Sequence, residues 1–151
     1  MKYDDASWHY GGDFPVDLPQ EAGATHIGMF LTWMLLHNFA SEELIEDSRD
    51  AIEHLKTKQI TGAHFLIDEL DEKLTDNDFN EEGNAFALAY YEGLNNDSRY
   101  IDDYLLSFSV DTNNVYRVAD TWENYHKLAN HIAERYRRWV MDGRPKYIAE
   151  R

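Results

Sequence analysis

The sequence predicts a mainly α-helical domain of about five helices. Apolar residues recur at helical spacing over residues 22–39 and again over residues 121–141. Between them, Ser41 is a good N-cap for an amphipathic segment at residues 42–57. The chain has 151 residues, of which 43% are hydrophobic, so it is long enough to bury a substantial core. We assign residues 1–151 to a single domain.

The segment at residues 22–39 is apolar on nearly every side, which predicts a central, buried helix. Its longest apolar run, residues 27–36, is about half the roughly 20 residues that a membrane-spanning helix requires, so we expect no membrane association. Acidic residues precede this run, unlike the basic start of a secretory signal, and the chain has no cysteine. We therefore expect a cytoplasmic protein.

Further helices are predicted after Thr61, at residues 83–92 and at residues 100–108, where apolar side chains again recur at helical spacing. The N-terminal residues 1–19 mix aromatic residues with turn formers and predict an ordered, extended segment. Residues 115–118 have the character of a short strand. A strand needs a partner, so we expect one short strand pair between this segment and the N-terminal one.

The charge is strongly negative and unevenly distributed. The net charge is −15, and residues 41–82 contain 14 acidic residues against 4 basic ones. Such a surface repels nucleic acid and attracts basic proteins, so we expect a basic protein partner and no nucleic acid. Solvated acidic helix faces that only promote solubility are an equally weighted interpretation. The carboxylates expected on this surface are Glu42, Glu43, Glu46, Asp47, Asp50, Glu53, Asp68, Glu69, Asp71 and Glu72.

The last 37 residues are the basic part of the chain, with 8 basic residues against 5 acidic ones. We interpret this basic end as complementing the protein's own acidic helices or a second copy of the chain. Its members include Arg135, Arg137, Arg138, Arg144, Lys146 and Arg151.

No motif in the sequence identifies a catalytic residue. The segment at residues 76–80 resembles a calcium loop, but Glu81 stands where the turn glycine is required. His126 and His131 are five residues apart, which rotates them off a common helix face. We therefore predict no enzyme, no metal site and no cofactor.

A second hypothesis places a small-molecule or metal site between the N-terminal aromatic segment and the first helix. The residues concerned are Trp8, His9, Tyr10 and His26. A buried, hydrogen-bonded histidine is the simpler interpretation of His9. A third hypothesis is a structural or regulatory subunit that forms a homodimer through its apolar surface.

Six blocks of the sequence are distinctive: residues 8–15 (WHYGGDFP), 21–33 (EAGATHIGMFLTW), 83–87 (GNAFA), 90–91 (YY), 100–104 (YIDDY) and 122–125 (WENY). These blocks resemble a family of small uncharacterised acidic bacterial proteins, and this resemblance implies no activity. By type, an acidic single-domain protein of this kind also resembles the immunity proteins with which bacteria neutralise toxins. That second resemblance implies binding to a basic toxin domain, often a nuclease, through the acidic carboxylates.

Overall fold

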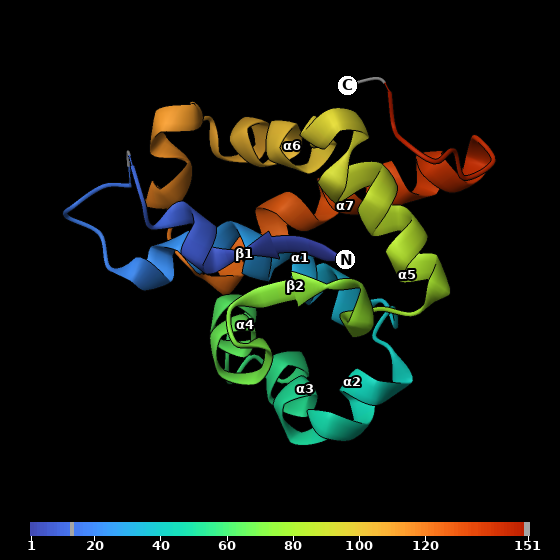
Figure 1. Cartoon of the computed structure of the whole chain (residues 1–151), viewed down its shortest axis with the longest axis horizontal. Coiled ribbons are helices and arrows are strands. Elements are labelled where there is room, and N and C mark those ends of the chain that lie inside the picture. Colours follow the sequence, from blue (N-terminus) through green and yellow to red (C-terminus); the bar gives the residue numbers. More distant parts are fainter. Residues whose placement is uncertain (13, 150–151) are drawn as a thin grey trace.

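Helices form most of the protein, which confirms the predicted mainly α-helical class. The computed structural model describes residues 1–12 and 14–149 (Figure 1). The strands are β1 (Lys2–Asp5) and β2 (Lys73–Thr75). The α-helices are α1 (Thr25–Leu36), α2 (Glu42–Asp47), α3 (Arg49–Lys56), α4 (Gly62–Leu70), α5 (Glu81–Phe86), α6 (Arg99–Phe108) and α7 (Trp122–Met141). The π-helix η4 spans Ala87–Glu92, and 3-10 turns occur at η1 (Ala6–His9), η2 (Gln20–Ala24), η3 (Asp76–Asp78), η5 (Leu94–Asn96) and η6 (Thr112–Arg117).

Helix α1 lies at the centre of the fold. Its residues from Thr25 to Leu35 are all buried, and the helix contacts α3, α4 and α7. This confirms the buried helix predicted from residues 22–39, although the 3-10 turn η2 precedes it and delays its start to Thr25. No helix in the described ranges combines the length and apolar character needed to cross a membrane.

Helices α1 and α4 cross at two glycines, and the contact leaves no space for a side chain. A Cβ atom on Gly62 would lie 1.9 Å from the carbonyl oxygen of Gly28 and 2.2 Å from Oγ1 of Thr32. A Cβ atom on Gly28 would lie 2.2 Å from the backbone nitrogen of Ala63. All three distances are far below van der Waals contact, so the crossing of the two helices depends on glycine at both positions.

The segment predicted as one helix at residues 42–57 is two helices, α2 and α3. Its predicted N-cap is confirmed, because Oγ of Ser41 accepts a hydrogen bond from the backbone nitrogen of Leu44 at 3.1 Å. The helix breaks at Ser48, whose φ and ψ of −128° and 32° lie outside the helical region. Leu44 before the break and Leu55 after it are both buried, so each helix contributes its own apolar face to the core.

The two-stranded sheet has a different partner from the predicted one. Strand β1 pairs antiparallel with β2, and Asp4 lies opposite Leu74. The predicted pairing with residues 115–118 is wrong, because this segment is the 3-10 turn η6 and the residue that ends it. Helix α4 ends at Asp71, which adopts the left-handed conformation (φ 53°), and the chain then reverses beside β1. Leu74 is buried within β2.

The long helix predicted at residues 121–141 is confirmed as α7. Thr121 caps it by accepting a hydrogen bond from the backbone nitrogen of Asn124 at 3.1 Å. Its buried side chains, which include Leu128, Ile132 and Trp139, pack into the core. The helix contacts both α1 and α6 (Figure 1).

Candidate functional site

The acidic surface predicted from the sequence extends over α2, α3, α4 and the turn after α4. Nine of its ten predicted carboxylates are exposed. Glu46, Asp47, Asp50 and Glu69 line one open hollow, together with Arg49 and His54. The fold therefore brings the acidic faces of α2 and α3 beside that of α4. The exposed members are Glu42, Glu43, Glu46, Asp47, Asp50, Glu53, Asp68, Glu69 and Asp71.

Three of the predicted carboxylates have partners within the chain. Asp68 lies 2.7 Å from Nε2 of His64, and Asp71 lies 2.9 Å from Nζ of Lys73. Glu72 is only partly exposed, and its carboxylate accepts a hydrogen bond from the hydroxyl of Tyr10. These three carboxylates already have partners within the chain. Among the described residues, the carboxylates of α2 and α3 and that of Glu69 form no ion pair, so they are the part of the surface most accessible to a partner.

The basic end of the chain does not cover the acidic surface. Arg135 pairs with Asp103 of α6 at 2.8 Å, and Arg144 pairs with Glu82 of α5 at 2.9 Å. In Figure 1 the C-terminal segment lies on the side of the molecule away from α2 and α3. Arg151 lies outside the described residues. Within the described ranges, none of the ion pairs involves a carboxylate of α2, α3 or Glu69.

The second predicted site, around the N-terminal aromatic segment, is assembled in part. His9 and His26 do meet, with ring centroids 4.6 Å apart and their planes almost perpendicular. Trp8 does not join them, because its side chain is 59% exposed and lies beneath Nζ of Lys2. Tyr10 is turned away to Glu72.

Asp4 completes this cluster and was not predicted from the sequence. Its Oδ1 lies 2.9 Å from Nε2 of His9, and its Oδ2 lies 3.6 Å from Nε2 of His26. Tyr91 donates a hydrogen bond to Oδ2 of Asp4 at 2.5 Å, and the hydroxyl of Tyr116 lies 2.6 Å from Nδ1 of His9. Asp4, His9 and His26 are hereafter called the N-terminal cluster.

Three separate elements position the cluster. Pairing of β1 with β2 fixes Asp4, and the first turn of α1 holds His26. Asp5 caps the 3-10 turn η1 by accepting a hydrogen bond from the backbone nitrogen of Ser7 at 2.9 Å, and this turn places His9 over the cluster. The arrangement depends on the sheet register, which no local sequence pattern predicts.

The two buried members of the cluster have shifted pKa values. Burial lowers the pKa of His26, and this outweighs the opposing effect of Asp4. Burial acts to raise the pKa of Asp4, but the neighbouring imidazoles of His26 and His9 hold it well below its usual range. At neutral pH the cluster therefore presents an ionised carboxylate and a neutral imidazole, which are the forms that bind metal ions.

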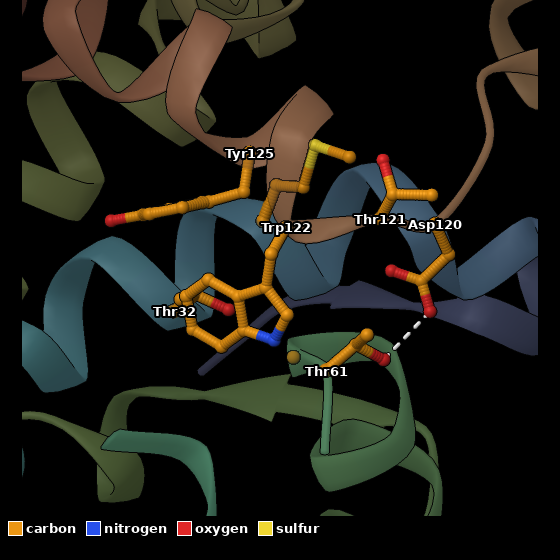
Figure 2. Close-up of a pocket in the computed structure, with 8 residues that line it drawn as sticks. Thr32, Thr61, Asp120, Thr121, Trp122 and Tyr125 are labelled. Atoms are coloured by element: carbon orange, nitrogen blue, oxygen red, sulfur yellow. Dashed lines mark hydrogen bonds between the residues drawn. The ribbon is translucent and has the colours of Figure 1, made fainter. Parts of the chain in front are cut away.

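Another pocket, shown in Figure 2, lies between α1, α4 and the start of α7. Oγ1 of Thr61 donates a hydrogen bond to Asp120 at 2.7 Å, and the indole of Trp122 donates one to the carbonyl of Ile60. The cavity volume of 10 Å³ is about the minimum that admits one water molecule. It is too small for an organic ligand. The labelled lining residues are Thr32, Thr61, Asp120, Thr121, Trp122 and Tyr125.

Comparison with known families gives one match. A family model described as "Domain of unknown function (DUF7832)" matches residues 2–118. The chain belongs to this family. The DUF7832 match includes the acidic surface and the N-terminal cluster, whereas α7 lies beyond it. It agrees with the predicted resemblance to an uncharacterised family. No curated protein and no solved structure matches the chain.

Proposed function

We propose that the protein is an inhibitor of the immunity-protein type, which binds a basic protein partner through the acidic hollow of α2, α3 and α4. The observation that carries this proposal is the gathering of Glu46, Asp47, Asp50 and Glu69 around one hollow. The partner we propose is a basic toxin domain, such as a nuclease, because a surface that binds nucleic acid is itself cationic.

The charge distribution supports this proposal over a purely solubilising role. Arg135 and Arg144 of the C-terminal part are paired with Asp103 and Glu82 rather than with the hollow. Carboxylates that form no ion pair among the described residues are available to lysine and arginine side chains of a partner. Opposite charge on the two proteins also speeds their association, by ten- to a thousandfold at low salt in known cases.

Two variants with the same change in net charge test the proposal. The first, E46K/D50K/E69K, reverses three carboxylates that line the hollow. The control, E21K/E123K/D142K, reverses three exposed carboxylates elsewhere on the protein. Each tagged protein is used to capture partners from the native host at moderate salt, and the bound proteins are quantified by mass spectrometry.

We expect the wild type and the control to retain a basic protein in a one-to-one ratio, and the hollow variant to lose it. Coexpression of that captured protein with each variant then measures neutralisation of its toxicity. Equal retention of the same partner by the hollow variant and the control contradicts the proposed surface. A captured protein that is acidic, or whose expression is harmless, contradicts the inhibitor function.

A further inference from the structure

The N-terminal cluster has the composition and convergence of a metal centre. One ligand atom from each of Asp4, His9 and His26 lies within 4.8 Å of the others. We propose that these three side chains bind a divalent transition metal ion of the zinc class. This site is independent of the acidic hollow and of any protein partner, since it lies on β1, η1 and α1.

The spacing between Asp4 and His26 fits a shared ion better than a hydrogen bond. Two ligands at about 2.0–2.1 Å from a tetrahedral zinc ion lie about 3.3–3.4 Å apart. Oδ2 of Asp4 and Nε2 of His26 are separated by 3.6 Å, close to this value and too far for a strong hydrogen bond. His9 would need to withdraw slightly from Asp4, from which it is 2.9 Å away, to complete the coordination.

His26 is difficult to explain as a core histidine satisfied by hydrogen bonds. Its side chain is 2% exposed, and within the described residues its Nδ1 atom is buried without a hydrogen-bond partner. In the described part of the chain, its Nε2 atom faces Oδ2 of Asp4 at 3.6 Å, which is long for a hydrogen bond. A buried polar ring without a short hydrogen bond costs free energy. A cation between Nε2 and the carboxylate supplies a strong interaction for Nε2, although not for Nδ1.

The groups around the cluster are those that support metal ligands in known sites. The hydroxyl of Tyr116 lies against Nδ1 of His9, which directs Nε2 of the same ring inward. Tyr91 donates to the carboxylate of Asp4. Both contacts fix a ligand from outside, and the ring of Tyr116 also packs at 5.9 Å from the ring of His26. Tyr116 is therefore a positioning residue for the proposed ion.

The donor set indicates which ions bind. Two imidazole nitrogens and one carboxylate oxygen suit Zn²⁺, Co²⁺, Ni²⁺ or Fe²⁺, whereas Mg²⁺ and Ca²⁺ prefer oxygen ligands. Three protein ligands leave one position of a tetrahedral ion for water or a solute. Because the ligands come from β1, η1 and α1, bound metal also ties the N-terminal segment to the central helix.

Titration of the full-length, chelator-stripped protein with Zn²⁺ and Co²⁺ tests this site. We expect one ion per chain with a micromolar or tighter Kd, and an absorption spectrum of four-coordinate Co²⁺. His9→Gln removes a ligand that is partly exposed and should weaken binding at least tenfold. His37→Gln, at an exposed histidine outside the cluster, is the matched control and should bind as the wild type does. Circular dichroism establishes that each variant is folded.

A second measurement separates metal binding at the N-terminal cluster from adventitious metal binding at the protein surface. Zinc at about 100-fold excess over Kd should raise the Tm of the wild type by about 5–10 °C and that of H9Q much less. Tyr116→Phe should bind the ion with lower affinity but with the same stoichiometry. Absence of binding at 100 μM zinc, or equal binding by H9Q and H37Q, overturns the proposal.

Discussion

The close crossing of α1 and α4 makes Gly62 the most sensitive single position for stability that we identify. In the G62A variant, the new Cβ atom would lie 1.9 Å from the carbonyl oxygen of Gly28. A normal contact of about 3.4 Å requires the two helices to separate by more than about 1 Å. Both belong to the buried core, so the separation also opens space around Phe65 and Leu66 of α4.

We estimate the cost of this substitution at about 3 kcal/mol or more. Overpacking of a core commonly costs about 1–3 kcal/mol, and here the obstructing atoms are backbone atoms that no rotamer change can move. The gain in helix propensity from glycine to alanine, about 1 kcal/mol at most, offsets only part of it. For a chain of this length, about 3 kcal/mol corresponds to a fall in Tm of about 6–12 °C.

Urea unfolding followed by circular dichroism measures the effect. Gly11→Ala is the control, because a Cβ atom on Gly11 meets nothing within 4 Å. We expect the control to match the wild type to within about 1 kcal/mol. A G62A variant as stable as the control would refute the argument that this glycine sets the distance between α1 and α4.

Two further predictions concern buried charges. Burial raises the pKa of Asp78 to about 6, so its ionisation opposes folding as the pH rises through that value. Asp78→Asn should therefore stabilise the protein by about 1–3 kcal/mol at pH 7.5, and this advantage should vanish as the pH falls towards 4; urea unfolding at the two pH values measures it. Arg135→Met leaves the buried Asp103 carboxylate without its 2.8 Å ion pair and should cost about 3–5 kcal/mol. The double variant R135M/D103N also removes the unpaired carboxylate charge, so its Tm in thermal unfolding should lie above that of R135M. An equal Tm for the two variants would show that the loss of the ion pair does not cause the destabilisation.

The helices were the part of the fold that the sequence could predict. The apolar periodicity of α1 and α7 and the cap at Ser41 are local signals, and each is confirmed. The break at Ser48 was missed because the residues around it continue the amphipathic pattern of a single helix. The register of β1 was missed because strand pairing joins residues about 70 positions apart and depends on where α4 ends.

The two candidate sites were predictable to different degrees. Exposure of the carboxylates on α2 and α3 follows from helical periodicity, and Glu46, Asp47 and Asp50 among them line a common hollow. The second hypothesis placed His9 and His26 in a site between the N-terminal aromatic segment and the first helix, and the two rings do meet. Asp4 escaped notice because its role depends on the pairing of β1 with β2, for which the sequence carries no local signal.

The most direct test of the proposed function is the rate at which the captured partner associates with the purified protein. Surface plasmon resonance with the immobilised partner gives this rate for the wild type, E46K/D50K/E69K and E21K/E123K/D142K at 50 and 300 mM salt. We predict that the hollow variant associates at least about tenfold more slowly than the control, and that the difference shrinks at high salt. Equal rates for the two variants at both salt concentrations would contradict a binding role for the acidic hollow.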